Sequence, residues 1–144
     1  MRRVRPKLPV ILALLGCGAG TVGLDERPSL VGTYDASITA DIFGEGIIYA
    51  VGTFVISQHT GGGEIRGAFA VKLETGELPS YSENGLVVGK VGRFRDVVLT
   101  LRFDGYTSTR FEGLWSSTGD ISGIWGPDDH PPLERQGMFR LRRR

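Results

Sequence analysis

The residues with the clearest potential for chemistry form one short run, Asp128-Asp129-His130, in a proline-rich segment. Two carboxylates beside an imidazole are typical metal ligands, but a metal site needs a third or fourth ligand of suitable geometry. The other histidine, His59, falls in a connection that we expect at the opposite end of the fold. A solvated turn is therefore the favoured interpretation, and we predict neither a metal nor a cofactor.

Nucleophilic catalysis has little support in the sequence. Cys17 is the only cysteine, and a Ser or Thr nucleophile would need an activating base. The chain has no Gly-x-Ser-x-Gly elbow, and its run of three glycines at residues 61–63 lacks the lysine and the following helix of a phosphate-binding loop. The sequence thus predicts a protein that is not an enzyme.

Cys17 stands at the end of a segment with the layout of a secretory signal. Four basic residues precede a short apolar run over residues 8–15, which is far below the roughly 20 residues needed to span a bilayer. A single exported thiol has no intramolecular disulfide partner, so covalent modification is its expected fate. A plain signal peptide or amphipathic leader with a chance cysteine is the alternative.

The residues Leu14-Leu15-Gly16-Cys17 resemble the lipobox of bacterial lipoproteins, although that family more often has a smaller residue in place of Leu15. The resemblance implies that residues 1–16 are a signal peptide and that Cys17 is lipidated. It also implies that the protein is held at a membrane of the cell envelope. The residue after Cys17 is Gly18 and not Asp, and in this respect the chain resembles lipoproteins that are sorted to the outer membrane.

The rest of the chain divides into a tether and one domain. Residues 17–28 are small and polar, and residues 29–144 are long enough for a single core. Four of the 17 Lys and Arg residues lie in residues 1–16, which leaves 13 against 16 Asp and Glu and a net charge of −3. A mildly acidic body with no basic stripe argues against nucleic acid as a partner.

Alternation with a period of two residues dominates from residue 29 onward and predicts β-strands. Two further segments are rich in β-forming residues but alternate poorly. The eight candidate strands cover residues 30–39, 47–57, 64–73, 85–94, 97–104, 110–115, 121–125 and 137–141.

Short glycine-containing connections between these segments predict antiparallel neighbours. Eight such strands with one apolar face can close into an up-and-down β-barrel, which removes exposed sheet edges. A two-sheet β-sandwich is the alternative. Closure is favoured by five glycines on the predicted inner face, because coiled strands need points of bending or close approach. These are Gly32, Gly67, Gly113, Gly123 and Gly137.

The predicted outer face argues against a barrel that spans a membrane. Charged side chains there would point into lipid, at a cost of roughly 2–4 kcal/mol for each Arg or Lys near the midplane. The residues concerned are Arg66, Lys72, Arg102, Arg110 and Glu112. The predicted inner face is apolar, which suits a barrel surrounded by water.

Residues 30–144 resemble a small meander barrel of the lipocalin and avidin kind. Gly32-x-Tyr34 is similar to the Gly-x-Trp of the first lipocalin strand, with Tyr in place of Trp. The resemblance further implies that Arg140 or Arg142 packs across that motif. It supports the fold more than an activity, because one fold hosts many functions.

An eight-strand meander places alternate connections at opposite ends. The long connections 40–46, 75–84 and 127–134 would form a mouth, and both termini would lie at a closed base. Candidate mouth residues are Phe43, Tyr81, Asp128 and His130. At the base, residues 142–144 would lie near anionic headgroups, with a solubilising tail as the alternative.

Aromatic residues on the inner face are the candidate ligand-lining residues, with both tryptophans deep in the pocket. They are Tyr34, Phe69, Phe103, Phe111, Trp115, Trp125 and Phe139. An eight-strand barrel holds either a solid core or one small molecule. Two functions follow: a lipid-anchored barrel that binds a small apolar or amphipathic ligand, or an envelope module with a packed core that contacts another protein.

Overall fold

The computed structural model describes most of the chain from residue 29 onward. The described residues are 29–42, 46–74, 80–103, 108–128 and 137–144. Cys17 and the predicted signal and tether therefore lie outside them, as do Phe43 and His130 at the predicted mouth.

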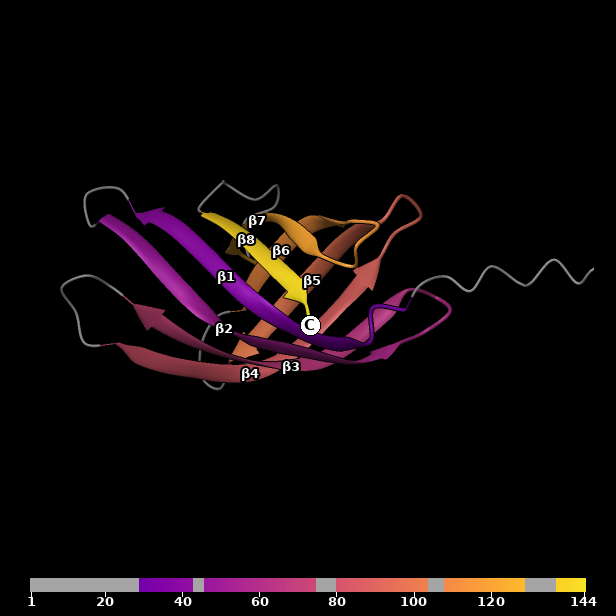
Figure 1. Ribbon diagram of the computed structural model, residues 1–144, viewed down its shortest axis with the longest axis horizontal. Coiled ribbons are helices and arrows are strands. Elements are labelled where there is room, and N and C mark those ends of the chain that lie inside the picture. Colours follow the sequence, from indigo (N-terminus) through magenta and orange to yellow (C-terminus); the bar gives the residue numbers. More distant parts are fainter. Residues whose placement is uncertain (1–28, 43–45, 75–79, 104–107, 129–136) are drawn as a thin grey trace, which may run out of the picture.

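The described residues form eight antiparallel strands that close into one barrel, in which β8 pairs with β1 (Figure 1). This confirms the predicted up-and-down barrel and shows that the β-sandwich alternative is wrong. The strands are β1 (Gly32–Ile42), β2 (Gly46–His59), β3 (Glu64–Glu74), β4 (Tyr81–Val91), β5 (Asp96–Phe103), β6 (Thr109–Trp115), β7 (Ile121–Pro127) and β8 (Gly137–Arg143).

The two strands with poor alternation take their register from their neighbours. Tyr34 faces inward on β1 and pairs with Phe54 of β2, which places that ring inside as well. β4 begins at Tyr81 and ends at Val91, so the predicted range of 85–94 is displaced by four residues at its start and three at its end. The displacement arises because Phe94 belongs to the next connection, where Arg95 has a left-handed backbone with φ of 66°.

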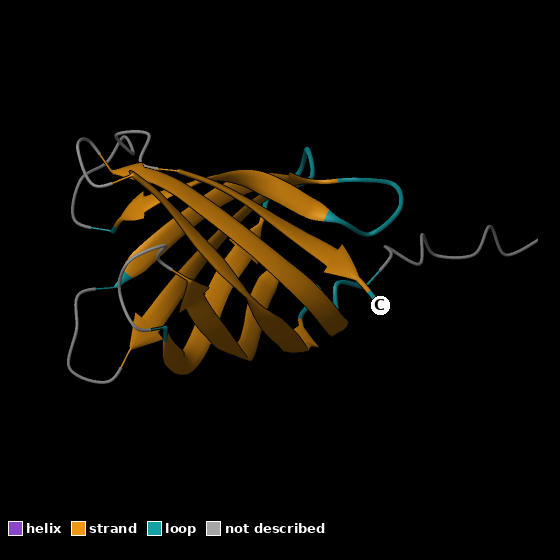
Figure 2. Ribbon diagram, turned by 60° about the vertical axis from the view of Figure 1, so that its left-hand side comes forward, coloured by secondary structure: helices purple, strands orange, loops and turns teal. Residues whose placement is uncertain are grey.

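The two ends of the barrel differ in their connections (Figure 2). The connections 60–63, 92–95 and 116–120 lie at one end together with the start of β1 and the C-terminus, and we call this end the base. At the opposite end, which we call the far end, the strands join segments outside the described residues. Both described chain ends thus lie at the base, as the meander topology predicts.

The interior is apolar. Among the described residues no polar or charged side chain is classed as buried, and the buried set comprises aliphatic and aromatic residues from all eight strands. The inward-facing glycines do not leave open space between neighbouring strands. A Cβ atom on Gly123 would collide with the Glu112 carbonyl, and one on Gly113 would lie 2.9 Å from Cζ of Phe139. The glycines therefore permit close approach of strands and rings.

The outer wall carries charged side chains at the predicted positions. Arg66, Lys72 and Arg102 are exposed, and Arg110 forms an ion pair with Glu112 at 2.6 Å. Within the described ranges, no helix is long and apolar enough to cross a membrane.

Candidate functional site

The far half of the barrel holds apolar inward side chains that are only partly buried. Leu73 of β3, Phe103 of β5 and Trp125 of β7 pack against the core without being enclosed by it. These three lie toward the far ends of their strands, whereas Val91, which is also partly buried against the core, ends β4 at the base. Small side chains, Ala40 and Ala50, occupy neighbouring inward positions on β1 and β2.

A cluster of aromatic rings packs beneath these residues. The ring centroid of Phe54 lies 5.7 Å from that of Phe69 and 6.2 Å from that of Phe111. Phe111 also meets Phe139 edge-on at 4.8 Å, which is a favourable geometry for aromatic pairs. Phe103 reaches down onto Phe69 at 5.0 Å. The cluster is thus a floor between the two halves of the barrel.

Trp125 joins the floor to the far end. Its ring stacks on Phe111 at 6.1 Å, and its indole Nε1–H donates to the Thr39 carbonyl oxygen at 2.9 Å. A Cβ atom on Gly137 would collide with the indole, so the glycine leaves room for the ring to lie flat across β8. Trp125 is therefore held in one orientation while part of its surface stays accessible.

The base is closed by Leu30, which precedes β1 and is fully buried. Its backbone N–H donates to His59 Nδ1 at 3.2 Å, and its carbonyl oxygen accepts from the Tyr34 hydroxyl at 2.7 Å. Burial raises the pKa of Tyr34 above its ordinary value of 10.0, which the Arg143 charge opposes in part. The start of the described chain is thus bonded into the barrel at two points.

Trp115 lies in the base and not beside Trp125. It is the last residue of β6, where it meets the His59 ring edge-on at 6.4 Å. Its indole Nε1 is buried and has no hydrogen-bond partner. The prediction that both tryptophans lie deep in one pocket is wrong, because β6 runs toward the base and Trp125 sits near the far end of β7.

Arg143 clamps the start of the chain. Its guanidinium donates to the Ser29 carbonyl at 3.0 Å and to the Val31 carbonyl at 2.9 Å. Because Tyr34 pairs with Arg143 across β1 and β8, the arginine beside Gly32-x-Tyr34 is Arg143. The implication that Arg140 or Arg142 packs there is wrong, since both belong to the outer wall.

The arginines that end the chain, residues 142–144, form several contacts with the barrel itself. Arg144 contacts Asp35 at 2.7 Å and donates to the Thr53 hydroxyl at 3.2 Å. Together with the clamp made by Arg143, these contacts hold the C-terminal residues against the barrel. A role of residues 142–144 at a membrane stays a prediction.

The remaining predicted mouth residues are spread over the far end. Tyr81 begins β4 and pairs with Leu73 in register. Asp128 follows β7, and its carboxylate accepts from the Ser108 hydroxyl at 2.8 Å. Within the described part of the chain, His, Cys, Asp and Glu side chains form no group of three that could hold a metal ion.

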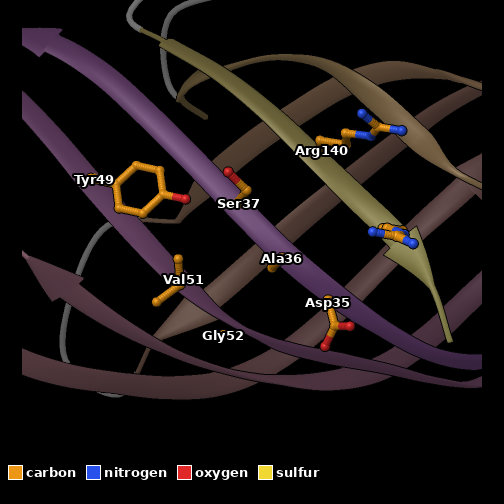
Figure 3. A pocket seen from close by; sticks show the side chains of 8 residues that line it. Asp35, Ala36, Ser37, Tyr49, Val51, Gly52 and Arg140 are labelled. Atoms are coloured by element: carbon orange, nitrogen blue, oxygen red, sulfur yellow. The ribbon is translucent and has the colours of Figure 1, made fainter.

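A shallow groove of about 460 Å³ runs along the outer wall over β2, β1 and β8 (Figure 3). Tyr49 and Val51 flank it on β2, with Ser37 on β1 and Arg140 on β8. Arg140 also donates to Asp120 at 3.0 Å. That hydrogen bond is the main cause of a lowered pKa of Asp120, and the Arg143 backbone N–H adds to it.

Sequence reasoning missed Phe54 and Leu30. Phe54 lies in a segment that is apolar on both faces, so only its pairing with β1 assigns it to the interior. Leu30 was expected as an ordinary strand residue, yet it precedes β1 and closes the base. Leu30 is held by hydrogen bonds to His59, which is 29 residues away in sequence, and to Tyr34.

Comparisons with known proteins found no match among protein-family models, curated proteins or solved structures.

Proposed function

We propose that the protein is a lipid-anchored, non-catalytic protein of the cell envelope that binds a small apolar or amphipathic molecule in the far half of its barrel. The lipid is carried by Cys17 in this proposal. Binding resembles that of a lipocalin in using the barrel interior.

The observation that carries the proposal is the partial exposure of Leu73, Phe103 and Trp125 above an apolar floor. Ligand sites are mostly apolar and concave, with few polar groups that fix orientation. The aromatic floor would limit the depth of entry, so the ligand would occupy the far half alone. The Trp125 ring, fixed by Thr39, would provide a flat contact surface.

Binding of a fluorescent apolar probe, anilinonaphthalene sulfonate, with displacement by palmitate, tests this function. Ala50 is buried and faces inward between Ile38 and Leu73 in register. The A50F variant fills the proposed space and should weaken probe binding about tenfold or more, equivalent to ~1.4 kcal/mol.

The matched control is A70F, because Ala70 is exposed and faces outward on β3. Circular dichroism verifies that both variants keep the barrel. Unchanged probe binding in A50F, or an equal loss in A70F, would contradict binding inside the barrel.

The second candidate function is an interaction module that meets another envelope protein through its outer wall. The groove beside Tyr49 favours it, because this ring is 41% exposed next to two arginines. A photo-crosslinker at position 49, compared with one at Arg102 on another part of the wall, tests it in the native envelope. A partner captured at both positions equally would count against the groove.

A further inference from the structure

We propose that the β4–β5 connection at the base is a membrane-contacting tip, with Phe94 entering the interface of a bilayer that contains anionic lipids. Arg93 and Arg95 flank it and would meet the headgroups. The inference deepens the proposed membrane location and rests on it for orientation. It is independent of any ligand in the barrel.

Phe94 is the most exposed large hydrophobic residue in the described part of the chain, with 83% of its surface accessible. Both neighbours, Arg93 and Arg95, are exposed as well. A single exposed apolar residue is common on protein surfaces. The arrangement at this turn is different because the aromatic ring stands at the tip of a hairpin between two cations, which suits the boundary between acyl chains and headgroups.

The backbone of the turn is held in several places. The Gly92 N–H donates to the Asp96 carbonyl at 2.7 Å, and the Phe94 N–H donates to the Asp96 carboxylate at 3.3 Å. The Arg95 carbonyl accepts from the Trp115 N–H at 2.9 Å. These bonds order the turn with Phe94 displayed toward solvent, so the ring needs no rearrangement to meet a membrane.

Arg95 adopts a backbone conformation that usually selects glycine. Its φ of 66° is the only positive value at a non-glycine residue in the described ranges. Such conformations are unfavourable for residues other than glycine and persist where the surroundings enforce them. Its guanidinium carbon lies 5.9 Å from the centre of the Trp115 ring, a cation–π contact that fixes the charge at the rim of the base.

Charge at the tip suits an anionic surface. Arg93 and Arg95 are exposed on either side of Phe94, and the Asp96 carboxylate accepts from the Phe94 N–H within the turn. An anionic surface would therefore attract this connection.

The proposed lipid would hold the same end near the bilayer. Residues 18–28 separate Cys17 from the described chain, which enters the barrel at the base. Even fully extended, those residues reach at most about 40 Å. The tip and the anchor would thus act at one surface, with the far end facing away.

Sedimentation with vesicles of phosphatidylglycerol and phosphatidylethanolamine tests the tip. The protein is residues 18–144 without lipid, which contains every strand and every ladder of the closed barrel. F94A should weaken binding about tenfold through the lost apolar contact. R93Q should weaken it about fivefold on these vesicles and leave binding to neutral vesicles unchanged.

The matched controls are L86A and R102Q on the outer wall. Leu86 is 61% exposed and pairs with the exposed Arg102 in register, so the two present the same chemistry away from the base. Both variants should bind as the parent does. Binding that F94A leaves unchanged would overturn the proposal, as would equal losses in F94A and L86A. Self-association abolished by F94A without vesicle binding would assign the tip to a second copy and also overturn it.

A second measurement uses the full lipidated protein in vesicles with brominated acyl chains. A tryptophan introduced by F94W should be quenched beyond the parent signal, and one introduced by L86W should not. This result depends on the tip, whereas failure of lipidation at Cys17 would appear separately as protein without attached lipid. Equal quenching of the two introduced tryptophans would contradict the proposed orientation.

Discussion

The base and the far half of the barrel are built from similar residues but are packed differently. At the base, Leu30 and Tyr34 are fully buried, and their polar atoms are bonded within the protein. In the far half, Phe103 and Trp125 remain partly accessible above the aromatic floor. The base is therefore closed by a fully buried side chain, whereas the far half presents large apolar side chains that are partly accessible.

The difference follows from where the chain enters. The segment before β1 crosses the base and is fixed by Arg143 and His59, which adds a plug that the far half does not receive from the described residues. A meander with an even number of strands brings the C-terminus to the same end. The closure of the base thus uses both ends of the described chain.

The largest contrast is expected between two Leu to Ala substitutions. L30A removes a fully buried side chain and should lower the free energy of unfolding by about 3 kcal/mol. L73A removes a partly buried side chain and should cost only about 1 kcal/mol. Urea denaturation measures both, and equal costs would show that the two halves are packed alike.

Y34F tests the hydrogen bond at the base and should cost about 1–2 kcal/mol, because the buried Leu30 carbonyl loses its donor. The raised pKa of Tyr34 adds a pH dependence. Stability from the neutral hydroxyl is fully present below pH 10.0 and is lost as pH rises through the folded-state pKa. Y34F should remove this alkaline loss, and an unchanged alkaline limb would contradict the assignment.

Replacement of Arg143 should have a smaller effect, since the clamp is exposed to solvent. R143A loses two hydrogen bonds to carbonyl oxygens and should cost about 1 kcal/mol. R142A on the outer wall should stay within about 0.5 kcal/mol. Thermal unfolding of R143A and R142A decides whether the hydrogen bonds of Arg143 or the overall positive charge of the C-terminal residues stabilises the base.

The smallest effect on stability is expected from substitution of Asp120, for which we predict only the direction of the change with pH. Its lowered pKa means that the contribution to stability is present above pH 3.8 and is lost as pH falls through the folded-state pKa. D120N should therefore flatten the acid limb of the stability curve. An acid limb identical to that of the parent would contradict a role for the Arg140 contact.

The sequence was sufficient for the number of strands and for the closed barrel, because six segments alternate clearly and the connections are short. It placed all seven predicted aromatics inside, of which five are buried and two are partly buried. It could not assign Phe54 or separate Trp115 from Trp125, since both depend on cross-strand register. The plug at Leu30 and the clamp at Arg143 depend on contacts up to 114 residues apart in sequence.

The contrast between the halves is tested most directly by the two native tryptophans, which lie one in each half. W115F leaves Trp125 as the only reporter in the far half, and W125F leaves Trp115 as the only reporter at the base. On titration with palmitate, the emission of Trp125 should shift and saturate, while that of Trp115 should stay constant. Equal responses from both, or a response from Trp115 alone, would contradict a closed base and a receptive far half.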